Sequence, residues 1–218
     1  MDLFIDSALY EEIEEIHTWG ILSGVTTNPS LIYRSKENFE ELIQKIAALV
    51  DGPVSAEVPS DTAEKMVVDA RKLACLNKNI VIKLPMTEEG IKATSILTRE
   101  KIQVNMTLIF SPNQALLASQ AGAQYVSPFI GRIDDISYDG ADLIKNIKKI
   151  FTQGNIPTKI IAASIRHPKH VLDAAINGAD IATIPYKVFK QMLKHPLTDS
   201  GLEGFNKDWN KYLKGDTK

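Results

Sequence analysis

One lysine interrupts a strongly apolar stretch of this chain. Residues 79–85 read Asn-Ile-Val-Ile-Lys-Leu-Pro, and Lys83 stands near the end of that run. A short β-branched run closed by proline predicts a strand buried on both faces. A buried ammonium is costly, so it either pairs with a carboxylate or loses its proton, and a neutral lysine amine attacks carbonyl carbon. Lys83 is therefore a candidate Schiff-base nucleophile, the alternative being a strand-end lysine that extends into solvent.

Other polar residues interrupt apolar stretches in the same way. Asp6, Glu57, Asn105 and Thr107 each lie in or at the end of an otherwise apolar run. Asp6 and Glu57 offer two carboxylates for separate acid–base tasks, provided that their environments differ. Each residue alone has a plain structural explanation, such as a helix cap for Asp6. The recurrence of such residues at successive strand ends favours a functional site.

A second group of polar residues suits a phosphate. Two arginines and two serines follow or end the later apolar runs, and guanidinium groups bind phosphate through bidentate, charge-assisted bonds. These residues are Ser127, Arg132, Ser164 and Arg166. The alternative for residues 132–135, Arg-Ile-Asp-Asp, is a solvated charge run. Together with Lys83, the group predicts a phosphorylated sugar whose carbonyl meets the amine.

The elements that must position these residues alternate between strand and helix patterns from end to end. Strands are expected at 3–6, 22–26, 54–58, 79–85, within 102–110, and at 124–128, 159–163 and 180–184. Helices are expected from a cap at Ser7 to Gly20, at 37–50, 61–77, 87–99 and 111–122, after a connection at 131–142, and at 168–178, 186–193 and 200–213. Eight such units predict an α/β fold, a single (β/α)8 TIM barrel with an extra C-terminal helix. A doubly wound open sheet is disfavoured because no glycine-rich phosphate loop follows any strand.

Composition narrows the functional classes. The chain has 218 residues, 44% of them hydrophobic and 24% charged, with a net charge of −2. This balance gives no electrostatic case for nucleic acid or an anionic membrane. A single cysteine and four histidines without ligand spacing predict neither a disulfide framework nor a metal site. With no signal peptide or membrane-spanning run evident, a cytoplasmic protein is expected.

The motifs at the strand ends resemble a known family. These motifs are FIDSA, GVTTNPS, VSAEV, IVIKLP, NMTLIF, VSPFIGRIDD, AASIR and GADIATIP, in order from about residue 2 to residue 186. Together they resemble the small transaldolase-like proteins, which include transaldolases and fructose 6-phosphate aldolases. The resemblance implies a (β/α)8 barrel that works without metal or organic cofactor.

The resemblance also implies roles for the site residues. Lys83 would form the Schiff base with the ketose, Asp6 would be the acid–base group of carbon–carbon cleavage, and Glu57 and Thr107 would hold a proton-shuttling water. Substrate contacts would come from the remaining matched positions, which are Asn28, Asn105 and Ser127 for the sugar and Arg132, Ser164 and Arg166 for the phosphate.

Two positions separate the branches of this family. The aldolases have glutamine where Glu57 stands and tyrosine where Phe129 stands, so this chain resembles the transaldolases. A lyase must protonate the enamine left on Lys83, and phenylalanine donates no proton. The expected reaction is transfer of dihydroxyacetone from sedoheptulose 7-phosphate to glyceraldehyde 3-phosphate, giving erythrose 4-phosphate and fructose 6-phosphate.

Three other functions stay open at this point. One is the fructose 6-phosphate aldolase, a lyase. Another is a pyridoxal phosphate enzyme that uses Lys83, although no partner for the ring nitrogen is apparent. The third is a non-enzymatic sugar-phosphate sensor on a barrel scaffold.

The pattern of the C-terminal region predicts that the protein associates into oligomers. We expect a catalytic barrel domain over residues 1–195 and a helical tail over 196–218. The tail carries an apolar stripe of Leu202, Phe205, Trp209, Tyr212 and Leu213 beyond the eight barrel helices. Such a stripe predicts contact between subunits, and the family resemblance implies pentamers or decamers.

Overall fold

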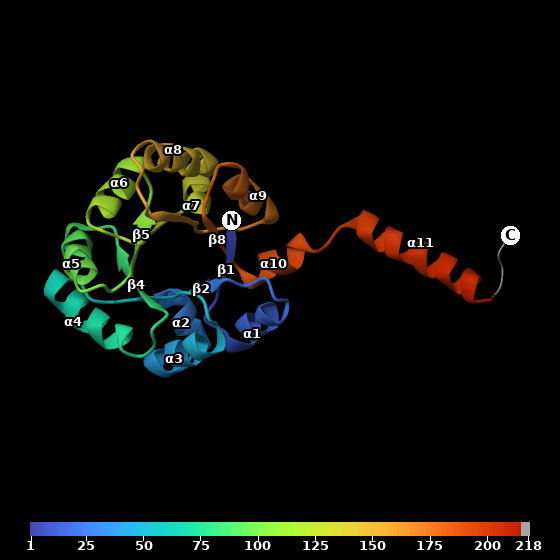
Figure 1. Cartoon of the computed structure of the whole chain (residues 1–218), viewed down its shortest axis with the longest axis horizontal. Helices are drawn as coiled ribbons and strands as arrows, with labels where there is room; N and C mark the ends of the chain where they lie inside the picture. Colours follow the sequence, from blue (N-terminus) through green and yellow to red (C-terminus); the bar gives the residue numbers. More distant parts are fainter. Residues whose placement is uncertain (215–218) are drawn as a thin grey trace.

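The computed structural model describes residues 1–214 and contains a closed barrel of parallel strands in chain order, β1 to β8 (Figure 1). The expected (β/α)8 barrel is confirmed. The strands are β1 Asp2–Asp6, β2 Gly24–Thr26, β3 Val54–Glu57, β4 Ile80–Pro85, β5 Val104–Ile109, β6 Tyr125–Pro128, β7 Lys159–Ala162 and β8 Ile181–Ile184. Both faces of these strands are buried because helices cover the outside and side chains fill the inside.

The helices form a ring around the barrel, with α11 as an exception (Figure 1). They are α1 Tyr10–Thr18, α2 Pro29–Ser35, α3 Phe39–Leu49, α4 Ala63–Ala74, α5 Glu88–Arg99, α6 Pro112–Gln120, α7 Ile130–Asp135, α8 Gly140–Gln153, α9 Pro168–Ile176, α10 Tyr186–Met192 and α11 Pro196–Leu213. Side-chain caps begin several of them. The Thr87 hydroxyl accepts from Gly90 N–H at 3.0 Å, and the Ser111 hydroxyl accepts from Gln114 N–H at 3.2 Å.

The structure corrects four expectations about these elements. Ser7 does not cap α1, which begins at Tyr10; its hydroxyl accepts from Leu9 N–H and donates to Glu12. A separate helix, α2, follows Asn28 where no helix was expected, and α7 occupies part of the expected connection at 131–142. The tail helix α11 begins at Pro196, four residues before the expected start.

The barrel interior explains why polar residues gather at one end. A separate cluster of buried side chains fills the inside of the barrel; its members are Phe4, Val81, Tyr125, Ile161 and Ile181. Because side chains in a strand alternate between faces, the residue two positions further along each strand also points inward, one layer nearer the carboxyl end. Those residues are Asp6, Lys83, Ser127, Ala163 and Thr183. Apart from Ala163 these residues are polar, and the apolar cluster forms a floor directly beneath them.

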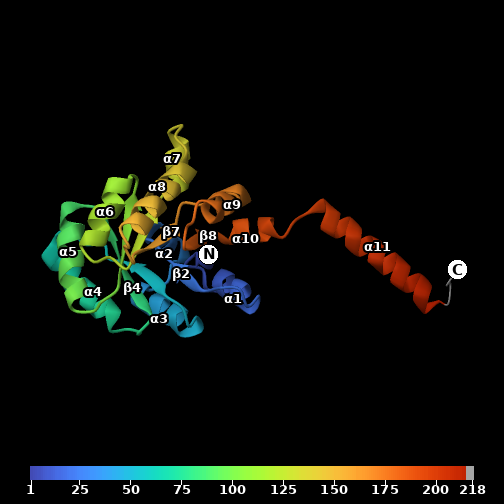
Figure 2. The ribbon, with the colours of Figure 1, turned by 45° about the horizontal axis from the view of Figure 1, so that its top comes forward.

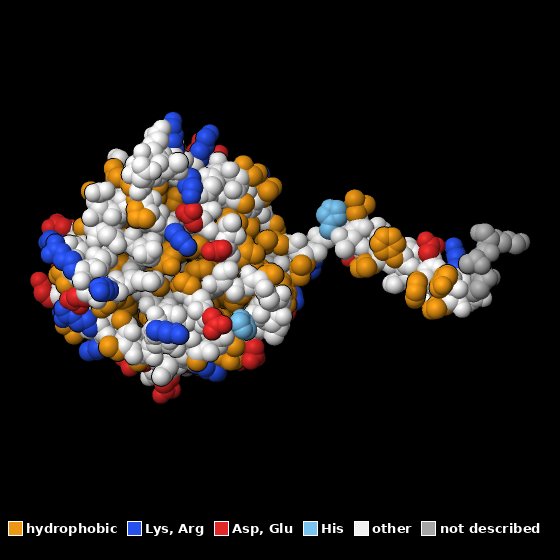
Figure 3. Space-filling model, in the orientation of Figure 1, with side chains coloured by type: hydrophobic (Ala, Val, Ile, Leu, Met, Phe, Trp, Pro, Cys, Tyr) orange, Lys and Arg blue, Asp and Glu red, His pale blue; other side chains and the backbone are white. Residues whose placement is uncertain are grey.

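The last helix lies apart from the barrel. Figures 1 and 2 show α11 directed away from the other elements in two orientations. Its apolar side chains are mostly exposed, with Phe205 at 75% and Trp209 at 61%, and Figure 3 shows them gathered along the projecting helix. The expected tail extends to residue 218, and residues 215–218 lie outside the described residues. Among the described residues no helix is both long and apolar enough to cross a membrane.

Candidate active site

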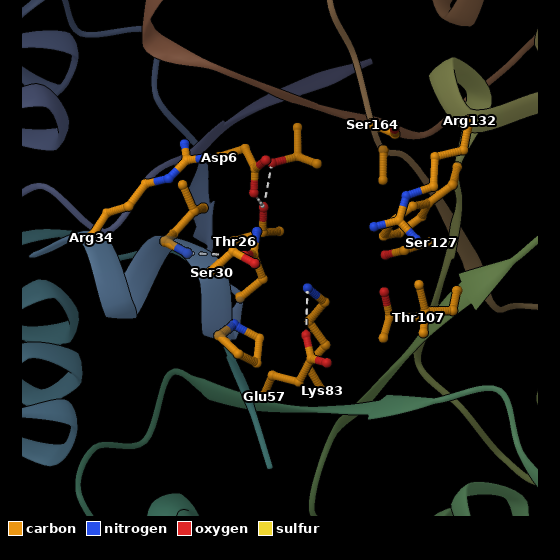
Figure 4. A pocket seen from close by; sticks show the side chains of 17 residues that line it. Asp6, Thr26, Ser30, Arg34, Glu57, Lys83, Thr107, Ser127, Arg132 and Ser164 are labelled. Atoms are coloured by element: carbon orange, nitrogen blue, oxygen red, sulfur yellow. Dashed lines mark hydrogen bonds and ion pairs between the residues drawn. The ribbon is translucent and has the colours of Figure 1, made fainter. Parts of the chain in front are cut away.

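A cavity of about 480 Å³ opens at the carboxyl ends of the strands, above the apolar floor (Figure 4). In a (β/α)8 barrel this end carries the functional residues. Nine of the eleven predicted site residues line the cavity, namely Asp6, Asn28, Glu57, Lys83, Thr107, Ser127, Phe129, Arg132 and Ser164.

Lys83 lies deep in this cavity and is 5% exposed. Its Nζ atom is 3.0 Å from Oε2 of Glu57 and donates to the backbone oxygen of Thr27 at 2.9 Å. Glu57 and Lys83 are direct partners in the register of β3 and β4, which brings their side chains to the same layer. Of the two fates expected for a buried lysine, the structure has the carboxylate pair, and the alternative of a solvent-extended lysine is wrong.

Asp6 occupies another wall of the cavity. Its Oδ1 accepts from the Thr26 hydroxyl at 2.9 Å, and the Thr26 and Thr183 hydroxyls lie 2.5 Å apart. Burial raises the pKa of Asp6, and the nearby charge of Lys83 and the hydrogen bond from Thr26 oppose that rise only in part. The two carboxylates therefore differ in environment: Glu57 is paired with a cation, whereas Asp6 is held by a hydroxyl.

An irregularity in β5 shapes the next wall. The register between β5 and β6 shifts between Met106 and Ile109, and Leu108 adopts a left-handed φ of 59°. Bulges of this kind redirect side chains beside functional sites. Both Thr107 and Leu108 line the cavity, and within residues 1–214 the Thr107 hydroxyl is buried without a hydrogen-bond partner. That hydroxyl is free to bind a water or a substrate hydroxyl.

The far wall carries two of the residues predicted to bind phosphate (Figure 4). Arg132, from α7, and Ser164, which follows β7 with a left-handed φ of 60°, lie on the same side of the cavity. The Phe129 ring packs edge-on against Phe110, with centroids 5.8 Å apart, and the Arg132 guanidinium lies 5.1 Å from the Phe129 centroid. The cation is thereby held at the edge of the cavity beside an apolar ring.

Two predicted residues lie outside the cavity lining. Asn105 is fully buried; it donates to the Ser55 hydroxyl at 3.2 Å and accepts from the Ser127 hydroxyl at 2.7 Å. Arg166 forms a bidentate ion pair with Asp135, both contacts being 2.5 Å. The structure thus links Asn105 to the cavity through Ser127 and places Arg166 beside Asp135 of α7.

The sequence reasoning missed several functional candidates. Ser30 and Arg34 of α2 line the wall opposite Arg132 (Figure 4), and Leu31 joins them. None of the α2 residues is buried, so no apolar stripe marked this helix in the sequence. The only signal was Asn28-Pro29, since Asn28 caps α2 by accepting from Leu31 N–H at 3.1 Å.

The comparisons with known proteins concern the chain as a whole. The sequence model of the Transaldolase/Fructose-6-phosphate aldolase family matches residues 3–215. The chain belongs to this family.

Relatives within the transaldolase/fructose-6-phosphate aldolase family cover nearly the whole chain. A protein of Caldicellulosiruptor saccharolyticus named "Probable transaldolase" is 59% identical over 215 residues, 98% of this chain and 99% of its own. A protein of Thermus thermophilus with the same name is 56% identical, covering 97% of this chain and 99% of its own. One from Brevibacillus brevis, also so named, is 58% identical over 96% of this chain and 98% of its own.

Solved structures extend the likeness of fold. Thiamine phosphate pyrophosphorylase from Pyrococcus furiosus superposes with a TM-score of 0.56 at 13% identity, covering 84% of this chain and 85% of its own. A mandelate oxidase variant gives a TM-score of 0.59 at 13% identity, covering 85% of this chain and 64% of its own. At this identity the likeness concerns the barrel alone.

Proposed function

We propose that this protein is a transaldolase that moves a dihydroxyacetone unit from sedoheptulose 7-phosphate to glyceraldehyde 3-phosphate, in the non-oxidative pentose phosphate pathway. The observation that carries the proposal is the pairing of buried Lys83 with Glu57 in a cavity that also holds Asp6 and an arginine. Membership of the family and the names of the relatives support it.

The first step is formation of an imine on Lys83. The paired ammonium must lose a proton before Nζ can attack the C2 carbonyl, and Glu57 at 3.0 Å is positioned to accept it. Loss of water from the resulting carbinolamine then needs a proton donor. A water held between Glu57 and the unpartnered hydroxyl of Thr107 would supply and recover that proton.

The second step is carbon–carbon cleavage. The Asp6 carboxylate takes the proton of the C4 hydroxyl, the C3–C4 bond breaks, and its electron pair enters the iminium on Lys83 to give an enamine. Erythrose 4-phosphate leaves. The enamine carbon then attacks the aldehyde of glyceraldehyde 3-phosphate while Asp6 returns its proton, and hydrolysis of the iminium releases fructose 6-phosphate. A carboxyl group with a raised pKa suits both directions of proton transfer.

The remaining residues of the site would bind the substrate. Asn28, Asn105 and Ser127 would bind the sugar hydroxyls, Asn105 acting through its hydrogen bond with Ser127. Arg132, Ser164 and Arg166 would bind the phosphate, for which Arg166 must give up part of its pairing with Asp135. This chemistry requires neither a metal nor an organic cofactor, and among residues 1–214 no three His, Cys, Asp or Glu side chains gather as a metal site.

Transfer is favoured over aldol cleavage because of what surrounds the enamine. Phe129 lines the cavity, and no tyrosine of the described residues does. Without a phenolic donor the enamine on Lys83 awaits an acceptor aldehyde in place of protonation and release.

We further propose the arrangement of the chain in its assembly. Residues 1–195 form the catalytic domain of a cytoplasmic enzyme, and the tail over 196–218 contacts another subunit in a pentamer or decamer. The exposed apolar side chains of α11 support this assignment, because such a surface on an isolated helix favours association.

Borohydride trapping tests the proposal. Wild-type protein incubated with fructose 6-phosphate and borohydride should gain the mass of a reduced sugar adduct on Lys83, located by peptide mass spectrometry. Lys83→Arg should gain none, and Asp6→Ala should still be trapped but release no aldose. Binding of the sugar without trapping would favour the sensor, and a visible absorption band with a bound pyridoxal group would favour the cofactor enzyme.

A further inference from the structure

The segment between β7 and α9 carries two of the proposed phosphate residues, Ser164 and Arg166, without regular structure. Ser164 has a left-handed φ of 60°, a conformation that surrounding contacts must maintain in a residue with a side chain. The start of the segment is fixed by the backbone, since Ala163 accepts from Ile130 N–H at 3.0 Å and donates to Pro128 at 2.9 Å. The rest of it depends on side chains.

His170 of α9 supplies a side-chain contact to the backbone of this segment. It is 5% exposed, and both ring nitrogens have partners. Nδ1 lies 3.3 Å from the backbone nitrogen of Arg166, which donates its N–H, so Nδ1 is the acceptor. The ring proton therefore sits on Nε2, which donates to Oδ2 of Asp134 at 2.7 Å.

Asp134 extends this contact to α7 and α8. Its other oxygen, Oδ1, accepts from Gly140 N–H at 2.8 Å, at the first residue of α8. Asp134 is two residues from Arg132, which lines the cavity from α7. One buried imidazole thus joins the backbone beside Ser164 to the short helix that presents Arg132.

Close packing supports the same connection. A side chain at Gly131 would place its Cβ atom 2.2 Å from the backbone oxygen of Ser164 and 2.9 Å from Nε of Arg166. Only glycine allows α7 to approach the segment so closely. The two pieces of backbone are in direct contact, and His170 holds them from behind (Figure 4 shows Arg132 and Ser164 on the cavity side).

We propose that His170 is a positioning residue of the phosphate subsite, which in its neutral form holds Ser164 and Arg166 against α7 through Asp134. This inference rests on the proposed function for the identity of the subsite's ligand. His170 does not line the cavity, so it touches neither the sugar nor Lys83. Its loss should weaken binding of the phosphorylated end and leave imine chemistry intact.

The charges around His170 support a neutral ring. Burial lowers the pKa of His170, and the hydrogen bond to Asp134 and the more distant charge of Asp173 oppose that shift. His167, whose ring is tilted by 47° to that of His170 at a centroid distance of 3.8 Å, lowers the pKa further. Arg166, whose backbone N–H donates to the ring, has its own side chain paired with Asp135. A second proton would go to Nδ1 and meet the Arg166 N–H, so acid pH should loosen the segment.

The experiment measures phosphate and imine separately. Inorganic phosphate is titrated by ³¹P line broadening, and dihydroxyacetone, which has no phosphate, is titrated by borohydride trapping. His170→Ala and Asp134→Asn should weaken phosphate binding by about fivefold to tenfold and leave the half-saturating dihydroxyacetone concentration unchanged. His17→Ala, a histidine of α1 that does not line the cavity, is the matched control.

A conservative variant guards against a folding defect. The amide oxygen of His170→Asn lies about where Nδ1 lies, so this variant should keep the bond from Arg166 N–H and recover part of the phosphate affinity. Equal weakening of phosphate binding and of dihydroxyacetone trapping would indicate a general structural role and contradict the proposal. An unchanged phosphate affinity in both His170 variants would also overturn it, as would a wild-type protein that binds no phosphate. Failure of the wild type to trap any sugar would instead count against the transaldolase, and the phosphate titration would still decide the role of His170.

Discussion

Glu57 and Lys83 are register partners on adjacent strands, and their side chains form the one ion pair that lies inside the cavity among residues 1–214. The other described ion pairs join groups that are considerably more exposed or lie outside the cavity lining. A carboxylate 3.0 Å from the amine both stabilises the resting ammonium and offers the base that must deprotonate it.

Removal of this carboxylate gives the first prediction. Glu57→Ala should slow trapping of fructose 6-phosphate on Lys83 by about 10²-fold at neutral pH, the scale of a lost acid–base group. Glu88→Gln, an exposed surface change, serves as control. A Glu57→Ala rate within twofold of wild type would show that Glu57 does not handle this proton.

The raised pKa of Asp6 predicts a pH dependence of stability. In the folded state burial disfavours the charged carboxylate, so the stability of the wild type should fall as pH rises through the raised pKa. Below about pH 4 both folded and unfolded states are protonated and the difference vanishes. Asp6→Asn should therefore be more stable than wild type in urea denaturation at pH 8, with the gap closing near pH 4.

Asp61 provides the opposite sign as a control. Its hydrogen bond from Lys65 lowers its pKa, so its contribution is present at neutral pH and is lost as pH falls. Asp61→Asn should then be slightly less stable than wild type at pH 8. If Asp6→Asn and Asp61→Asn shift stability in the same direction at pH 8, the assigned environment of Asp6 is wrong.

The barrel and its polar layer could be predicted because both follow from periodicity. Alternation within strands places Val81 and Lys83 on one face, and the same rule applies to Phe4 and Asp6. Parallel strands then bring all their carboxyl ends together. The predicted residues at the strand ends meet in one cavity for this reason.

The features that could not be predicted from the sequence depend on contacts between residues far apart in the chain or on helices too short to show a pattern. The pairing of Arg166 with Asp135 joins residues 31 apart, and the bulge at Leu108 depends on how β5 meets β6. The helices α2 and α7 are too short, and bury too few residues, to show an apolar period. Asp134 and Asp135 were weighed as a solvated charge run, yet each holds a cationic or imidazole partner.

The exposed helix α11 gives a prediction about assembly. Deletion of residues 196–218 should reduce the number of subunits per particle measured by sedimentation equilibrium, because the apolar stripe that includes Phe205 and Trp209 would be lost. Phe205→Glu with Trp209→Glu should have the same effect while keeping the helix. Lys207→Glu, a charged change on the same helix, should not alter that number. An unchanged number of subunits in the deletion variant would mean that α11 makes no subunit contact.

Phe129 gives the prediction that separates transfer from cleavage. The enamine on Lys83 has two exits: attack on an acceptor aldehyde, or protonation followed by release of dihydroxyacetone. Because Phe129 has no hydroxyl and packs against Phe110 and Arg132, wild-type protein with fructose 6-phosphate alone should release dihydroxyacetone slowly. Adding erythrose 4-phosphate should greatly accelerate consumption of the donor.

Phe129→Tyr adds one hydroxyl with little change of shape, so it should raise dihydroxyacetone release and lower transfer. A tenfold change in that partition needs only about 1.4 kcal/mol of differential barrier. Phe110→Tyr, whose ring neighbours Phe129 but does not line the cavity, is the matched control. Equal donor consumption by the wild type with and without acceptor would establish the aldolase instead.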